Sequence, residues 1–374
     1  MKKTIIWVVV VLVVVGLGWL ISGNKSTAPS GGAIKIGAIY PLTGGLAIYG
    51  EPAQKATALA VEDINKAGGI NGKNLEVVFE DHKCDPKTAL SAFQKLSAEG
   101  VKVFTSVACS GTALAIAPEL ANNQAVLLGT TLSTPKLSGV SPFLFRNWAS
   151  DIQESKLFAD EVQKQGYKKV AAIYEATDYA KGLVINMQDF LKDSGVSFDT
   201  ESFVTGATDV RTQLTKIQAT KPDVIFVSVQ TVTSGEVVLK QLEELDIKTK
   251  LFLNDNIIIA PQLVSAHSKF LEGSLGAQYV LQSPEVANQA LVEYKTKYGV
   301  ECSQPAVCAA AYDTTNILAK ALKETDGSAN AVKQYLSQVN YAGASGQISF
   351  DQNNDRVGAI YSMFVVKGGV VEKI

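Results

Sequence analysis

The chain has 374 residues, of which 47% are hydrophobic and 19% charged, a composition that supports folded globular cores and argues against disorder. Its net charge of -2 includes no basic stripe, and aromatic residues do not alternate with Lys or Arg, which excludes a nucleic-acid groove. The length predicts two domains.

The chain begins with an apolar segment. Residues 5–21 carry no charge and follow Lys2 and Lys3, so residues 1–22 can act as a cleaved signal peptide or as a membrane span. Either role exports the rest of the chain. The run is close to spanning length and bulky to its end, which favours an uncleaved anchor. Residues 23–32, rich in Ser, Gly and Pro, form a linker. We expect an extracytoplasmic protein tethered to the cytoplasmic membrane.

Strand-like and helix-like segments then alternate as in repeated βαβ units. The expected strands are residues 34–40, 75–80, 101–107, 125–128, 169–174, 197–203, 223–229 and 250–253. The expected helices are residues 52–66, 86–99, 112–121, 151–165, 181–194, 209–219, 234–245, 284–298 and 309–323. Two strands of antiparallel character, residues 346–350 and 359–366, close the chain. The pattern predicts an α/β fold with two lobes.

The four cysteines are expected to form disulfides in an oxidising compartment, because no C-x-x-C pair or histidine cluster indicates a metal site. Cys302 and Cys308 are near neighbours, which leaves Cys84 to pair with Cys109. We expect no metal and no other cofactor.

Catalytic motifs are missing from the sequence. Neither His82 nor His267 lies beside a nucleophile at the end of a strand, and there is no G-x-S-x-G elbow. The first strand-to-helix loop, residues 41–50, has no dinucleotide fingerprint. Residues 68–74 lack the spacing of a phosphate loop, and residues 351–362 lack the Gly and Glu of a calcium loop. We expect a binding protein and not an enzyme.

A carboxylate site is predicted where the strand at residues 101–107 runs into a helix. Ser110, Gly111 and Thr112 offer backbone amides and hydroxyls there, and Ser110 is also a candidate N-cap. Asp255, after the strand at residues 250–253, suits an ammonium group, with an ordinary turn residue as the alternative.

Other loops are expected at the same edge of the sheets, because ligands bind at the carboxyl ends of strands in doubly wound folds. Thr131 and Ser133 can add donors, although an ordinary Ser/Thr-rich loop is the alternative. Tyr49 and Tyr179 can close over an apolar or zwitterionic ligand, although surface tyrosines are the alternative.

Several stretches together resemble a known family, the periplasmic leucine/isoleucine/valine-binding proteins of branched-chain amino-acid ABC transporters. They are Ile34-Lys35-Ile36-Gly37, Glu62-Asp63-Ile64-Asn65, Gly68-Gly69-Ile70-Asn71-Gly72, Cys84-Asp85-Pro86, Cys109-Ser110 and Ala311-Tyr312-Asp313. The resemblance extends from Ala33 to the end of the chain. It implies a type I periplasmic binding protein: two doubly wound, Rossmann-like lobes joined by a three-strand hinge. Lobe 1 would hold residues 33–149 and 281–350, and lobe 2 residues 150–280 and 351–374.

The resemblance also assigns roles to residues. It implies a disulfide between Cys84 and Cys109 beside the cleft, and it gives Ser110 the ligand carboxylate and Asp255 the ligand ammonium. Thr131 and Ser133 match a loop that supplies a carbonyl and a hydroxyl. Tyr49 and Tyr179 match aromatic residues around the ligand, whereas Gln230 replaces a second wall tyrosine and makes that wall more polar.

The expected function is that of a monomeric solute receptor. It would deliver a branched-chain amino acid, or a related small zwitterion, to the membrane subunits of an ABC permease. The alternative is a sensory ectodomain or binding module for an amide or another small polar solute, without coupling to transport.

Overall fold

The structure is a computed structural model that describes residues 32–281 and 284–374. The predicted signal or anchor segment, residues 1–22, and all but the last residue of the predicted linker lie outside the described residues. Within the described part, no helix combines the length and the apolar character needed to span a membrane.

Five parallel strands form the first sheet, in the order β2-β1-β3-β4-β5. They are Ile34–Tyr40 (β1), Leu75–Asp81 (β2), Val103–Val107 (β3), Val126–Thr130 (β4) and Leu144–Arg146 (β5). Every residue of β3 and β4 is buried, as expected for central parallel strands covered on both faces.

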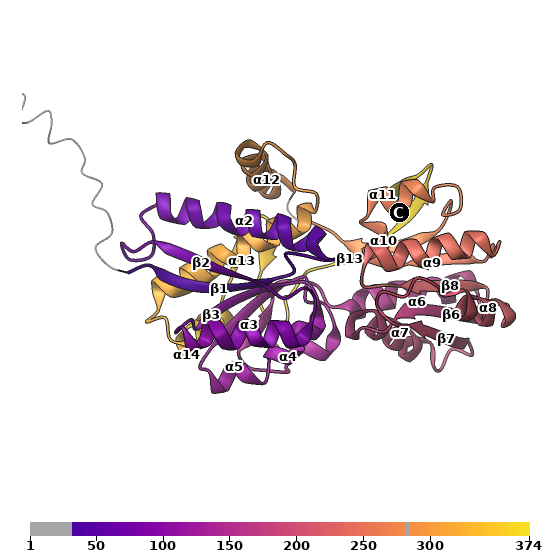
Figure 1. Cartoon of the computed structure of the whole chain (residues 1–374), viewed down its shortest axis with the longest axis horizontal. Helices are drawn as coiled ribbons and strands as arrows, with labels where there is room; N and C mark the ends of the chain where they lie inside the picture. Colours follow the sequence, from indigo (N-terminus) through magenta and orange to yellow (C-terminus); the bar gives the residue numbers. More distant parts are fainter. Residues whose placement is uncertain (1–31, 282–283) are drawn as a thin grey trace, which may run out of the picture.

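Helices cover both faces of this sheet, and together they form the first lobe (Figure 1). Its further elements are Ala47–Lys66 (α2), Pro86–Ala98 (α3), Ser110–Ile116 (α4), Glu119–Asn122 (α5), Pro135–Leu137 (η1), Pro284–Tyr298 (α12), Pro305–Glu324 (α13), Ala329–Ser337 (α14), Tyr341–Gly343 (β11) and Gly346–Ile348 (β12). Apolar side chains of α2, α13 and α14 pack on one face, and those of α3 and α4 pack on the other. The three-layer core fixes the loops at the carboxyl ends of the strands.

The second sheet has the order β14-β13-β10-β9-β8-β6-β7. Its strands are Lys169–Glu175 (β6), Ser197–Phe203 (β7), Val224–Ser228 (β8), Lys250–Leu253 (β9), Leu275–Tyr279 (β10), Tyr361–Lys367 (β13) and Val370–Lys373 (β14). The strands from β7 to β10 are parallel, whereas β13 and β14 add an antiparallel edge.

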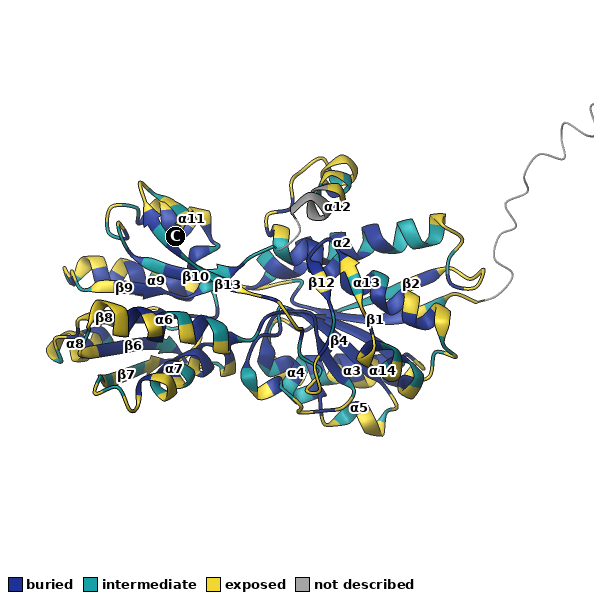
Figure 2. Cartoon of the chain, turned by 180° about the vertical axis from the view of Figure 1, so that it is seen from behind, coloured by how far each residue is buried: buried dark blue, intermediate teal, exposed yellow. Residues whose placement is uncertain are grey.

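The helices of the second lobe are Asp151–Gln165 (α6), Asp178–Leu191 (α7), Arg211–Ala219 (α8), Val232–Glu244 (α9), Asp255–Ile258 (α10) and Pro261–Ala266 (α11). Side chains of α6 and α7 pack on one face of the sheet, and those of α8, α9 and α11 pack on the other. Buried residues line the sheets of both lobes, while the exposed residues lie mainly on the outer helices and loops (Figure 2). The chain passes between the two sheets after β5, after β10 and after β12.

Several element boundaries differ from the sequence prediction. Helix α2 begins at Ala47, five residues before Pro52, so this proline lies inside the helix. A glycine is required at position 50, because a Cβ there would lie 2.0 Å from the carbonyl oxygen of Pro41. The helix expected at residues 112–121 is split into α4 and α5 around Pro118.

The two strands expected at the end of the chain do not pair with each other. Strand β12 forms a hairpin with β11, whereas β13 pairs with β10 and β14. The elements β5, β10, β11, β14, α10, α11 and α14 were not predicted. Most of them are short, so hydrophobic periodicity carries little signal for them.

Candidate functional site

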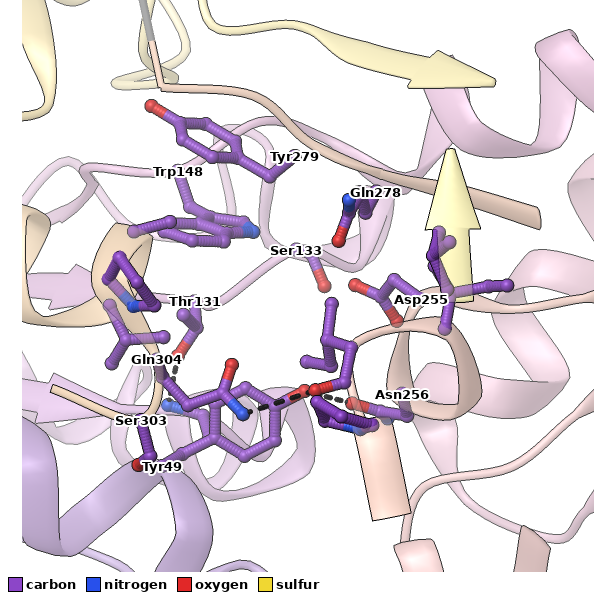
Figure 3. A pocket seen from close by; sticks show the side chains of 18 of the residues that line it. Tyr49, Thr131, Ser133, Trp148, Asp255, Asn256, Gln278, Tyr279, Ser303 and Gln304 are labelled. Carbon is purple, nitrogen blue, oxygen red and sulfur yellow. Dashed lines mark hydrogen bonds between the residues drawn. The ribbon is translucent and has the colours of Figure 1, made fainter. Parts of the chain in front are cut away.

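A cavity of about 520 Å³ lies between the two lobes (Figure 3). The predicted binding residues belong to six loops at the carboxyl ends of strands, and all six contribute to the lining: residues 40–50, 108–112, 130–135, 175–182, 229–234 and 254–257. The lining includes seven of the predicted binding residues, namely Tyr49, Ser110, Thr131, Ser133, Tyr179, Gln230 and Asp255. The fold therefore brings together residues that are up to about two hundred positions apart in the sequence.

The wall of the first lobe is a constrained loop. Cys109 is bonded to Cys84, with a Cα–Cα distance of 5.4 Å, and the backbone of Ala108 and Cys109 is left-handed, with φ of 57° at each. The Ala108 amide donates to the Thr130 carbonyl at 3.1 Å and to the Thr131 hydroxyl at 2.7 Å. Non-glycine residues hold this conformation only where the surroundings fix it, so the loop is preorganised.

The hydroxyl of Ser110 donates no hydrogen bond to the residues that the structure describes. Its hydroxyl oxygen accepts a hydrogen bond from the Thr134 amide at 3.2 Å, which leaves the hydroxyl proton available to a ligand. The N-cap position belongs to Cys109, and Ser110 is the first helical residue, so the predicted N-cap role of Ser110 is wrong.

Gly111 and Thr112 are not part of the cavity lining. The hydroxyl and the amide of Thr112 both donate to the Cys109 carbonyl, at 2.7 and 2.8 Å. Thr131 likewise uses its hydroxyl within the loop, donating to the Thr130 carbonyl at 2.6 Å. Thr112 therefore stabilises the helix start and does not offer donors to the cavity.

Asp255 lies on the opposite wall, at the start of α10. Its carboxylate accepts hydrogen bonds from the Tyr179 hydroxyl and, at 3.4 Å, from the Tyr361 hydroxyl. The amide group of Asn254 donates to the Tyr179 oxygen at 2.9 Å and thereby orients the ring. Burial raises the pKa of Asp255 from its usual value to about 6.

Two further acids, Asp151 and Glu154, lie behind Asp255 on one turn of α6; we call them the carboxyl pair. Both are completely buried. Glu154 Oε1 accepts a hydrogen bond from the Asp255 amide at 3.1 Å. Glu154 Oε2 and both carboxyl oxygens of Asp151 have no hydrogen-bond partner within the described residues. Burial, and then the Asp255 charge, raise the pKa of both acids well above the usual range.

Arg146 holds the loop that carries Ser133. Its guanidinium donates to the carbonyls of Ser133 and Thr134, at 3.0 and 2.7 Å, and to the carboxylate of Asp355. The Asp151 amide also donates to the Ser133 carbonyl, at 2.9 Å. The position of Ser133 is thus set by the connections between the lobes.

The rest of the wall was not predicted from the sequence. Trp148 and Tyr279 stack with ring centroids 4.1 Å apart, on the side of the cavity opposite Tyr49 and Gln304 (Figure 3). Both aromatic residues lie next to connections between the lobes. Periodicity does not show which chain connections line a cleft, so only their aromatic character could have pointed to them.

The fold and the cavity together define a two-lobed binding protein, in which loops of two doubly wound sheets enclose a ligand. A sequence model of the periplasmic binding protein family matches residues 33–370. The chain belongs to this family. Because the family consists of solute-binding proteins, the expectation of a non-enzymatic, extracytoplasmic protein is confirmed.

Individual relatives and solved structures agree with this family assignment. The chain is 31% identical to a Leu/Ile/Val-binding protein homologue of Brucella melitensis over 196 residues, which are 52% of this chain and about half (53%) of the relative. It is 23% identical to a leucine-, isoleucine-, valine-, threonine- and alanine-binding protein of Pseudomonas aeruginosa, over 90% of each chain. The crystal structure of a branched-chain amino-acid transporter binding protein from Streptococcus pneumoniae, in complex with isoleucine, has a TM-score of 0.77 and 26% identity. That comparison covers 91% of this chain and 99% of the other.

Proposed function

We propose that this protein captures an α-amino acid between its lobes and delivers it to an ABC importer. The observation that carries the proposal is the charge distribution in the cavity. Asp255 is the only charged side chain among the described residues that line it. An ammonium group at Asp255 and a carboxylate at the Ser110 hydroxyl would each find the complementary partner. A zwitterion satisfies both ends, whereas a simple anion leaves Asp255 unpaired.

The relatives support this function. The Pseudomonas relative is named for five amino acids, and the Streptococcus structure holds isoleucine. In this chain, the ammonium end would comprise Asp255, Tyr179 and the carbonyl of Thr131, and the carboxylate end Ser110 and Ser133. Tyr49 and Gln230 would face the ligand side chain.

The proposed division into lobes explains how ligand binding would close the protein. Lobe 1 comprises residues 33–149 and 281–350, and lobe 2 comprises residues 150–280 and 351–374, with three connections as the hinge. A ligand that touches both lobes stabilises the closed form by its greater affinity for that form. The closed monomer would then be the shape that the permease subunits recognise.

We also propose that residues 1–22 tether the protein to the cytoplasmic membrane. The uncharged run of residues 5–21 supports this. If the segment is retained as an anchor, the protein will sediment with membranes after alkaline carbonate washing. Release of a chain shortened by about 22 residues would show that the segment is a cleaved signal peptide.

The test of the function is a ligand screen by thermal unfolding on the purified chain. We expect at least one α-amino acid to raise the melting temperature, and the corresponding amine and carboxylic acid not to do so. Asp255→Asn and Ser110→Ala should each reduce the shift. No response to any of the twenty amino acids would contradict the proposal. Co-purification with permease subunits would separate transport from the alternative role in sensing.

A further inference from the structure

Gln230 has a buried side chain that faces the cavity without a partner. Its exposed fraction is 8%, and it is part of the cavity lining. Within the described residues, its side-chain amide makes no hydrogen bond, although a primary amide can donate two and accept two. Gln230 is not among the residues with a fully buried side-chain atom that lacks a partner, so its amide is open to the cavity. A ligand that displaces water from this amide without replacing its hydrogen bonds leaves a buried polar group unpaired, which is costly.

The backbone of Gln230 is fixed, which directs the side chain. The amides of Gln230 and Thr231 donate to the buried carboxylate of Glu175, at 2.8 and 3.2 Å. The Gln230 carbonyl accepts from the side-chain amide of Asn256 at 3.0 Å. Asn256 also accepts a hydrogen bond from the Tyr49 hydroxyl and donates its other amide proton to the Val229 carbonyl at 3.0 Å, so both of its donors are used. Of these two side-chain amides, only that of Gln230 keeps free donors within the described residues.

Two other glutamines line the same cavity. The side-chain amide of Gln278 makes no hydrogen bond to any described residue. In the described part of the chain, the side chain of Gln304 has one partner: its Nε2 donates to the Ile259 carbonyl at 3.4 Å (Figure 3). A ligand with an aliphatic side chain would displace water from these amides without replacing its hydrogen bonds.

We infer that the preferred ligand is an α-amino acid whose side chain carries a hydroxyl or amide group, and that Gln230 selects it over the aliphatic amino acid of the same shape. The inference rests on the proposed amino-acid function and narrows its substrate class. A site that hydrogen-bonds a ligand discriminates against the analogue that lacks the group, because the analogue leaves the site's own polar group unpaired.

The test compares near-isosteric pairs by calorimetry on the full chain: threonine with valine, asparagine with leucine, and glutamine with methionine. We expect the polar member of the best-binding pair to bind at least about fivefold more tightly. Tighter or equal binding of the aliphatic member would overturn the inference and leave the proposed function standing. Failure of every amino acid to bind would overturn both. This comparison uses the unaltered protein, so no variant has to fold.

Gln230→Met supplies the second arm, because methionine keeps the length of the side chain and removes its amide. The preference within the pair should vanish or reverse in this variant. Gln163→Met, an exposed position on α6, is the matched control and should keep the preference. A preference that persists in Gln230→Met would overturn the role of Gln230. The preference for the polar amino acid is also measured in Gln278→Met, which removes another unpaired amide of the cavity lining. The conclusion then does not depend on whether Gln230→Met folds.

Discussion

The hydroxyl of Tyr49 on α2 donates a hydrogen bond to the side-chain oxygen of Asn256 on α10, and this bond joins the two lobes across the cavity. A second contact between the lobes, the ion pair of Lys136 with Asp178, has a distance of 2.7 Å but is half-exposed. Exposed ion pairs contribute little, so the buried Tyr49–Asn256 bond is the more important contact for closure.

Tyr49→Phe should therefore weaken ligand binding by about fivefold, because it removes one hydrogen bond that exists in the closed form, worth about 1 kcal/mol. Calorimetric titration with the best amino acid measures the change. Tyr167→Phe, which removes a hydroxyl that forms no hydrogen bond within the described residues, is the control. Equal loss of affinity in both variants would argue against a closure role for Tyr49.

Ligand affinity should depend on pH through Asp255. Burial raises its pKa to about 6, so protonation competes with the ligand ammonium below that pH. We expect the dissociation constant to rise by up to about tenfold per pH unit below 6 and to be nearly constant from 7 to 8. In Asp255→Asn, binding should be weak at every pH and lack this dependence. An affinity that stays flat from pH 8 to 4.5 would show that Asp255 does not hold the ammonium.

Glu154→Gln should stabilise the unliganded protein at neutral pH. The folded protein raises the pKa of Glu154, so the folded state binds the proton more tightly than the unfolded state, and stability falls as pH rises above the unfolded pKa. Glutamine keeps an acceptor for the Asp255 amide and carries no charge. We expect the gain in melting temperature to be absent near pH 4 and to reach roughly 2 to 4 °C at pH 8.

The matched control for that substitution is Asp160→Asn on the exposed face of the same helix, where the carboxylate pairs with Lys156 in solvent. It should leave the melting temperature within about 1 °C at both values of pH. A melting temperature of Glu154→Gln below that of the unaltered protein at pH 8 would contradict this prediction. It would mean that neighbouring groups compensate the buried charge of Glu154.

The disulfide between Cys84 and Cys109 should matter for the binding loop as well as for stability. Replacing both cysteines by serine opens a loop with a sequence separation of 25 and should cost about 3 kcal/mol of unfolding free energy. It should also reduce affinity, since the left-handed backbone at Ala108 and Cys109 loses its constraint. The disulfide between Cys302 and Cys308 closes a separation of only 6, so its removal should cost less. Denaturant unfolding and calorimetry measure both effects, and an unchanged affinity in the first variant would contradict the preorganisation of the loop.

The sequence predicted much of this architecture because alternating apolar segments and strand-end loops carry strong signals. Both disulfides formed as expected, and the six loops meet at one cavity. The features that could not be predicted from the sequence depend on tertiary contacts. Thr112 is a suitable donor by type, yet the left-handed turn at Cys109 directs both of its donors to a carbonyl.

The burial of the carboxyl pair could not be predicted from the sequence either. Asp151 and Glu154 have the sequence of an ordinary acidic first helical turn, which is normally solvated. Only the packing of α6 against the second sheet reveals that they are buried behind Asp255. Likewise, Trp148 and Tyr279 are adjacent only because two connections between the lobes run side by side.

The central claim is that an α-amino acid binds between Asp255 and Ser110, and calorimetric titration of the unaltered chain and of Asp255→Asn tests it most directly. We predict saturable binding of at least one amino acid with a stoichiometry of about one, and a loss of affinity of about a hundredfold or more in Asp255→Asn, because a charged hydrogen bond is removed. Binding of that amino acid with unchanged affinity in Asp255→Asn would contradict the account.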